Sequence, residues 1–356
     1  MHFARLALLL PLAFAACSER GWPGPGSGSR ALVVLKDGNA AVVTLADHAV
    51  APRSAPAMAI STDAALRLEP DALYVVNRFG FDNVLVLDPA TLAVRKQFST
   101  GSGANPQDVA VLAPDRIYVP LYQTGEVLVA DPTQPDGAEV LARIDLKSLD
   151  PDPTPTSAVV ADGEVFVALA FIDPATYAPK RDAAVAVIDP ASGTVVTTID
   201  LPGKNPFARM QHVPGTGVLV LDLAEDFGGT TGCYATVDGP ARVATCAVTN
   251  AACGGWSGAL WATGAGHVWA AAAAGFQVDG TLCHFTIDGT LLKAGIAVTG
   301  SLTDVGVSDR GEVWAVDSKG TGGLWLFDAD TDEPLTTAPL DLTAPPAFAS
   351  GVVFLP

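Results

Sequence analysis

The segment "LYVVNRFGFDNVLVLDPATLAVRKQFSTGSGANPQDVAV", residues 73–111, decides the fold of this chain. Its apolar residues come in short alternating runs, which is the spacing of half-buried β-strands. Turn-forming pairs separate these runs, with Asp88-Pro89 after the second run and Asn105-Pro106 before the last. Asp caps its own turn and Pro presets the backbone, so each pair predicts a reversal of the chain.

The same pattern recurs along the whole chain. The first run, LYVV at 73–76, has apolar counterparts that begin at residues 32, 117, 165, 218, 268 and 313. The second run and its Asp turn recur as VLVADPTQP (127–135), VAVIDPASG (185–193) and LWLFDADTD (324–332). A period of about forty to fifty residues fits four strands with their turns.

The repeats predict an all-β fold, a seven-bladed β-propeller of four-stranded antiparallel blades. We take the LYVV-type strand as the innermost of each blade, and the strand after the Asn-Pro turn (105–111) as its fourth. A closed ring of blades leaves no long open sheet edge. The C-terminal ASGVVFLP (349–356) matches a fourth strand without a successor. It would close the ring as an outer strand beside the first blade, unless the terminal blades meet through a weaker contact.

The quoted segment resembles the YVTN β-propeller repeat. The positions that match are Tyr74, Val75, Asn77, Val86, Asp88 and Pro106. The match is strong in this unit, fair in the third, fourth and seventh, and poor in the fifth and sixth. The resemblance covers most of residues 31–356 and implies the propeller fold, but it implies little about function because propellers host many activities.

The N-terminus predicts export. Residues 1–16 carry a short charged region, an apolar run and two small residues, which are the features of a secretory leader. The Cys17 that follows resembles the lipobox of bacterial lipoproteins, with Phe14 where that family prefers Leu. The resemblance implies cleavage before Cys17 and its lipidation, and Ser18 favours the outer membrane. The alternative is ordinary secretion, with Cys17 in the discarded segment. Residues 17–30 are rich in Gly, Ser and Pro and predict a flexible tether.

Composition limits the possible partners. Apolar residues make up 49% of the chain and charged residues 16%, so it has a large core. The formal net charge is −18, which repels phosphate backbones and argues against nucleic-acid binding. Solubility is the plain explanation of that charge, and attraction of a cationic ligand is the alternative.

Four cysteines follow Cys17, and an even number in an exported chain predicts two disulfides. The connectivity is open, but a hairpin across Gly239-Pro240 would place Cys233 opposite Cys246, leaving Cys253 for Cys283. Their spacing matches no zinc pattern.

Signatures of catalysis are missing from the sequence. It has no G-x-S-x-G elbow, no H-E-x-x-H pair and no phosphate loop. None of the five histidines forms an i, i+4 pair, and we expect surface or hairpin roles for His267 and His284. The DADTDEP stretch (328–334) lacks the Gly and Glu of a calcium loop and is interpreted as a turn.

Stacking the repeats predicts one polar end of the central channel, which we call the channel mouth. It collects residues from the ends of the LYVV-type strands and the starts of the fourth strands, because antiparallel neighbours meet there. The predicted ligand-binding set is Asn77, Arg78, Asp108, Tyr122, Arg209, Asp222, Asp304 and Asp317. The alternative is that these side chains cap turns and bond to backbone groups across blades.

The sequence supports two functional hypotheses, one for a binding module and one for an enzyme. The first is a lipid-anchored, monomeric cell-envelope module without cofactor or catalysis, which binds an envelope protein, a peptide or a small ligand at the channel mouth. The second is a lactonase-like hydrolase with a divalent cation such as calcium in the channel. Its ligands would be Asp108, Asp222, Asp304 and Asp317, since carboxylate oxygens suit a hard cation.

Overall fold

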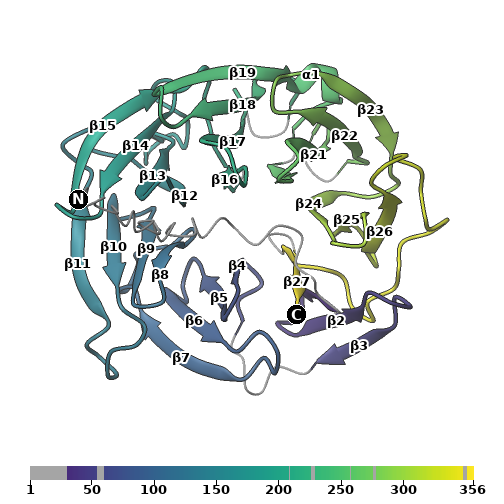
Figure 1. Cartoon of the computed structure of the whole chain (residues 1–356), viewed down its shortest axis with the longest axis horizontal. Helices are drawn as coiled ribbons and strands as arrows, with labels where there is room; N and C mark the ends of the chain where they lie inside the picture. Colours follow the sequence, from purple (N-terminus) through teal and green to yellow (C-terminus); the bar gives the residue numbers. More distant parts are fainter. Residues whose placement is uncertain are drawn as a thin grey trace, which may run out of the picture.

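The computed structural model describes residues 30–53, 60–207, 209–225, 229–256, 258–275, 278–347 and 351–356. In these ranges the chain forms seven antiparallel sheets that follow one another around a central channel (Figure 1). The predicted seven-bladed β-propeller is therefore confirmed. The leader, Cys17 and the tether before Arg30 lie outside the described residues.

Each sheet is one blade, and its strands succeed one another from the centre of the ring outward. Blade one contains β27 (Val352–Leu355), β1 (Arg30–Val34), β2 (Ala40–Thr44) and β3 (Val50–Arg53). Blade two contains β4 (Ala64–Glu69), β5 (Ala72–Asn77), β6 (Asn83–Leu87) and β7 (Val94–Ser99). Blade three contains β8 (Ala110–Ala113), β9 (Arg116–Leu121), β10 (Glu126–Ala130) and β11 (Val140–Asp145). Blade four contains β12 (Pro155–Ala161), β13 (Glu164–Leu169), β14 (Ala184–Asp189) and β15 (Thr194–Asp200).

The remaining blades include the two with the weakest repeats. Blade five contains β16 (Gln211–His212), β17 (Val218–Leu223), β18 (Cys233–Asp238) and β19 (Val243–Thr249). Blade six contains β20 (Ala259–Ala262), β21 (His267–Ala272), β22 (Thr281–Thr286) and β23 (Leu291–Ala297). Blade seven contains β24 (Leu302–Val307), β25 (Glu312–Asp317) and β26 (Gly323–Asp328). Residues 334–340, with two prolines, make isolated bridges to β26 in place of a fourth strand.

The predicted grouping of strands into blades was wrong by one strand. The strand after the Asn-Pro turn, β8, pairs with the following β9, so it is the innermost strand of the next blade. The LYVV-type strand is therefore second from the centre. The physical reason is hairpin length: only Pro70-Asp71 separate β4 from β5, only Pro114-Asp115 separate β8 from β9, and two-residue turns join neighbouring strands.

The C-terminal strand closes the ring. Strand β27 pairs antiparallel with β1, with Leu32 opposite Val353. The expected place beside blade one is correct, but β27 is the innermost strand of that blade rather than an outer one (Figure 1). Hydrogen bonds between the two ends of the described chain thus replace two open edges.

The core is divided among the contacts between adjacent blades, which we call seams. Each seam of the described chain holds its own apolar cluster: the cluster between blades one and two contains Leu32, Leu73 and Leu92, and the one between blades four and five contains Phe166 and Leu221. Because alternate residues of a strand face opposite sides, each middle strand contributes to two seams. A strand such as β5, buried along its whole length, is the result.

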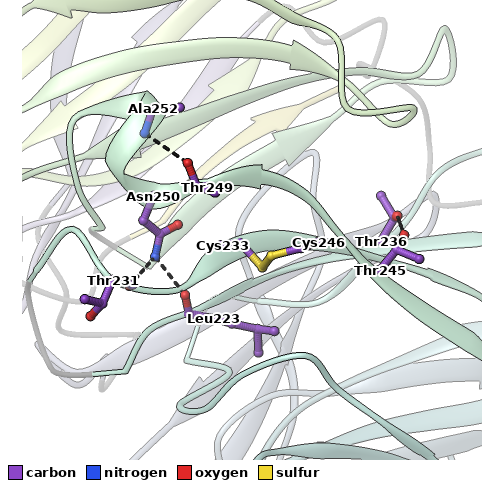
Figure 2. Close-up of a disulfide and its surroundings, with 9 residues drawn as sticks. All are labelled: Leu223, Thr231, Cys233, Thr236, Thr245, Cys246, Thr249, Asn250 and Ala252. Carbon is purple, nitrogen blue, oxygen red and sulfur yellow. Dashed lines mark hydrogen bonds between the residues drawn. A yellow bond between two sulfur atoms is a disulfide. The ribbon is translucent and has the colours of Figure 1, made fainter.

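Both predicted disulfides form. Cys233–Cys246 joins β18 to β19, although a register shift makes Ala235 rather than Cys233 the strand partner of Cys246 (Figure 2). Cys253–Cys283 joins α1 (Asn250–Cys253), which follows blade five, to β22 of blade six. The second disulfide therefore links two blades whose Ala-rich strands supply less apolar volume than the Leu- and Val-rich strands elsewhere.

Candidate functional site

An ion pair lies in the central channel. Arg67 of β4 donates to Asp108 through Nε (2.8 Å to Oδ1) and Nη2 (2.6 Å to Oδ2), and each side chain is 2% exposed. The same Nη2 donates to the backbone oxygens of Ala158 (3.2 Å) and Met210 (3.1 Å). One guanidinium therefore joins blades two, three, four and five, and the carboxylate of Asp108 is fully compensated. Arg67 was not predicted from the sequence, where it lies within the largely apolar strand AALRLE.

A belt of hydrogen bonds connects the innermost strands of neighbouring blades. Asp108 Oδ2 accepts the N–H of Ala158 (3.1 Å), and Ser157 Oγ accepts the N–H of Met210 (3.3 Å). In blade seven, Asp304 Oδ2 accepts the N–H of Val352 (2.7 Å) from blade one. Ser157 and Asp304 have the same register, each opposite the next-to-last residue of the adjacent strand. The alternative interpretation, bonding to backbone groups across blades, is thus confirmed for Asp108 and Asp304.

Arg209 reaches across the channel. Its Nη1 donates to the backbone oxygen of Leu66 (2.7 Å) in blade two, and its guanidinium lies 6.0 Å from the ring centre of Trp261. Burial lowers the pKa of Arg209, and the nearby Asp304 opposes this. Burial likewise raises the pKa of Asp304, against the effects of Arg209 and the Val352 N–H. The two side chains therefore stabilise each other's charged form inside the channel.

Asn77 and Asp317 have one and the same structural role. They are the last residues of β5 and β25, and each accepts a backbone N–H from sixteen residues upstream, Ser61 for Asn77 (2.8 Å) and Ser301 for Asp317 (2.8 Å). Asp317 also accepts the Lys319 N–H (2.8 Å). Both are buried, so neither presents a free group at the channel mouth.

Asp222 does not belong to this set, which corrects the stacked alignment. The last residue of β17 is Leu223, so Asp222 is one residue early and faces the opposite side of the sheet, with Val220 and Tyr234, toward blade six. Its carboxylate is fully buried and has no hydrogen-bond partner; the Gly258 N–H and the Asn250 side chain lie near it without completing a bond. Burial raises the pKa of Asp222 well above its usual value.

Arg78 and Tyr122 remain at the surface of the channel mouth. Arg78 Nη2 pairs with Asp63 (2.5 Å), and its Nη1 donates to Gln107 (3.3 Å). Tyr122 lines a cavity of about 170 Å³ between blades three and four, with Pro151, Pro153, Ile172, Pro174 and Tyr177 among its other walls. These two residues are partly exposed at this end of the propeller.

Exposed aromatic side chains extend this surface over three blades. Phe79 and Phe81 in the β5–β6 loop are 72% and 51% exposed, and Tyr177 in the β13–β14 loop is 72% exposed. The backbone N–H of Phe79 donates to Asn105 Oδ1 and that of Tyr122 to the Asn105 backbone oxygen, so Asn105 joins these two loops. Tyr122 and Tyr177 line the same cavity. We call Phe79, Phe81, Tyr122 and Tyr177 the aromatic rim. Sequence analysis missed it, although "NRFGFDN" places two Phe in a loop, where strand burial cannot hold them.

The four carboxylates proposed as cation ligands lie in separate environments. Asp108, Asp304 and Asp317 bond to backbone N–H groups, Asp108 also binds Arg67, and Asp222 faces a seam. Across the described ranges, no three His, Cys, Asp or Glu side chains form a group that could hold a metal ion. The DADTDEP stretch is a turn, in which Asp328 Oδ1 accepts the N–H groups of Asp330 (3.1 Å) and Thr331 (2.8 Å). The ligand set on which the hydrolase hypothesis depends is therefore not assembled.

The described ranges contain no helix long and apolar enough to cross a bilayer.

Comparisons with known proteins relate this chain to others through its fold. No protein-family model matches it, and no curated protein matches its sequence. Among solved structures, a quinoprotein alcohol dehydrogenase-like protein of Bacteroides thetaiotaomicron is similar at TM-score 0.60 and 13% identity, over 92% of this chain and 78% of that one. Hydrazine synthase of Kuenenia stuttgartiensis is similar at TM-score 0.52 and 14% identity, over 76% and 75%. The dihydro-heme d1 dehydrogenase NirN is similar at TM-score 0.52 and 15% identity, over 94% and 78%. The chain therefore shares the β-propeller architecture with these proteins, and at these identities the likeness extends to the fold alone.

Proposed function

We propose that this protein is a non-enzymatic binding module of the bacterial cell envelope, which holds a protein or peptide partner on its aromatic rim. Residues 1–16 are the lipoprotein leader, Cys17 carries the lipid anchor in the outer membrane, and residues 17–30 are the tether. Residues 31–356 form a monomeric propeller of YVTN-type repeats that works without cofactor or nucleic acid.

The observation that carries the proposal is the contrast between the channel and the rim. The charged groups of the channel are bonded to one another or to backbone groups, so a ligand there would have to displace them. The aromatic rim instead leaves Phe79 and Tyr177 about three-quarters exposed on loops held by rigid blades. Exposed aromatic residues are enriched at protein interfaces because they bury a large area at small entropic cost.

Two further observations favour an exported protein that binds proteins or peptides. The disulfides Cys233–Cys246 and Cys253–Cys283 persist in oxidising compartments such as the periplasm. The net charge of −18 disfavours anionic polymers as partners. The disulfides support a location outside the cytoplasm, and the negative charge supports a partner that is neutral or cationic.

The rim is tested by replacing single residues of the full-length lipoprotein with a photo-crosslinking phenylalanine analogue. We expect discrete protein adducts from positions 79 and 177 in intact cells. The matched control is Val196 on β15, which is 52% exposed but lies on the outer edge of blade four. The same analogue at this position should give no adduct, because the position lies outside the rim.

A change at a second rim residue completes the test. In the Phe79→Ser chain, crosslinking from position 177 should fall about tenfold, which corresponds to about 1.4 kcal/mol of lost binding. Equal crosslinking from positions 79, 177 and 196, or none from any, would contradict a binding surface at the rim.

The anchor predicts a separate result. Cys17→Ser should abolish incorporation of labelled fatty acid and move the protein from the membrane pellet to the soluble fraction, because two or three acyl chains hold it there. Ser18→Asp is the matched control: it should keep the label but shift the protein from the outer toward the inner membrane. An unlabelled wild-type chain would contradict lipidation and favour ordinary secretion.

A further inference from the structure

A chain of polar side chains crosses the seam between blades six and seven. His267 Nδ1 lies 2.8 Å from His284 Nε2, and His284 Nδ1 lies 3.0 Å from Asp332 Oδ1. Trp269 Nε1 donates to the same Asp332 oxygen (3.2 Å), and the His284 ring stacks on the Trp269 ring with centres 3.9 Å apart. The two histidines and the tryptophan belong to blade six, whereas Asp332 follows β26 of blade seven.

The repeat itself shows that this seam does not need polar residues. Asp332 and Leu92 occupy the same place in the Asp turn. Each donates its backbone N–H to the backbone oxygen of the Asp four residues earlier, and each has a positive φ. Leu32 pairs with Val42 in blade one as Trp269 pairs with His284 in blade six. Leu32 and Leu92, with the partly buried Val42, form an ordinary apolar cluster between blades one and two. Blades six and seven thus carry His284 and Asp332 where the corresponding seam carries Val42 and Leu92.

The hydrogen bonds fix the order of the protons. An ionised Asp332 accepts from His284 Nδ1–H, so His284 Nε2 is left as an acceptor for His267 Nδ1–H. The free lone pair then lies on Nε2 of His267, which is less buried than His284. Protonation of both imidazoles would set two N–H groups against each other across 2.8 Å.

The charged groups around the chain offer little other compensation. Lys293 of β23, the strand partner of His284, pairs with Glu333 (3.2 Å). Asp328 bonds within its own turn, and Asp288 bonds to Thr286 and to the Thr290 N–H. Asp330 in the Asp turn of blade seven is exposed, as are Asp309 and Arg310, which join β24 to β25. The state of the seam therefore depends on the two imidazoles and Asp332.

We propose that the His267–His284–Asp332 chain is a proton-operated latch, which holds blades six and seven together near neutral pH and releases their seam in mild acid. Burial and the neighbouring His267 lower the pKa of His284, against the effect of Asp332. The unfolded chain therefore takes up more protons than the folded one as the pH falls below about 6.5, and the seam loses stability in that direction.

Hydrogen exchange of the full-length protein, followed at pH 7.5 and pH 5.0 and corrected for the intrinsic rates, tests the latch. We expect exchange in β26 and β22 to accelerate about tenfold at pH 5.0, equivalent to about 1.4 kcal/mol of lost protection. The pair of changes His284→Val and Asp332→Leu copies the seam between blades one and two. This variant should fold, because replacing a buried polar pair by apolar residues is often neutral or stabilising, and it should lose the acceleration.

His48→Gln is the matched control. His48 bonds to Glu312 (3.2 Å) across the seam between blades seven and one, but no second histidine of the described chain faces it. The His48→Gln protein should show the same acceleration of hydrogen exchange in β22 at pH 5.0 as the wild type. The latch is wrong if the wild type shows no acceleration there, or if the doubly changed chain accelerates equally. Nitrogen NMR at pH 7.5 gives a second readout: both rings should carry their proton on Nδ1, and any other pair of tautomers contradicts the proton order.

Discussion

Arg67→Met should lower the free energy of unfolding by about 3–5 kcal/mol at pH 7, the cost of leaving one charge of a buried pair without its partner. Asp108 would keep the N–H bonds from Ala158 and Val109 but lose both guanidinium bonds. The backbone oxygens of Ala158 and Met210 would also lose a donor. Urea unfolding of the disulfide-bonded protein measures the change.

Two variants make this result specific to the ion pair. Arg67→Met combined with Asp108→Asn should recover part of the loss, since an amide oxygen still accepts the Ala158 N–H and neither charge of the pair stays buried. Arg30→Met removes an arginine that bonds to the Ala90 backbone oxygen (2.8 Å) at an exposed site, and should cost less than about 1 kcal/mol. A loss below about 1 kcal/mol for Arg67→Met would show that the channel does not depend on the pair.

Asp222→Asn should raise the free energy of unfolding above neutral pH, in contrast to Arg67→Met, which lowers it. The folded-state pKa of Asp222 is raised, so the folded protein holds a proton that the unfolded chain releases above about pH 4. Stability of the wild type therefore falls as the pH rises from there, by about 1.4 kcal/mol per pH unit up to the folded pKa. The amide of the variant is neutral at every pH and should remove this slope.

Thermal and urea unfolding from pH 5 to pH 8.5 measure the effect. Asp317→Asn is the control, because the carboxylate of Asp317 already has N–H donors from Ser301 and Lys319 and the amide of Asn77 fills the same register in blade two. Burial also raises the pKa of Asp317, but less than that of Asp222, so Asp317→Asn should reduce the slope only in part. Identical slopes for wild type and Asp222→Asn would contradict this prediction, because they would mean that Asp222 is ionised in the folded protein.

Much of the fold was predictable because its signals are local. The alternating runs, the Asp turns and the spacing of the repeats predicted strands, hairpins and seven blades. The place of Asn77 and Asp317 at strand ends followed from the same periodicity. Cys233 and Cys246 were paired correctly from hairpin geometry, although a register shift makes Cys246 a diagonal rather than a direct neighbour.

The errors came from the alignment of the repeats and from contacts between blades. Strand β8 could belong to the blade before it or to the blade after it. The two-residue turn at Pro114-Asp115 pairs it with β9, in the blade after it. Asp222 was aligned one residue away from its true register, and in a strand such a slip moves a side chain to the other face. Arg67 was overlooked because its partners lie 41 to 143 residues away, on other blades.

The sequence by itself determined the architecture of this protein: repeat length, strand period and turn chemistry are properties of neighbouring residues, and a ring follows once each unit must bury both of its faces. Only the tertiary structure decided which side chains meet. It bonded most of the predicted charges at the channel mouth to other side chains or to backbone groups, left Phe79, Phe81 and Tyr177 exposed, and brought His267, His284 and Asp332 together across one seam. These outcomes depend on contacts between blades, where a side chain's partner is set by position around the ring and not by distance along the chain.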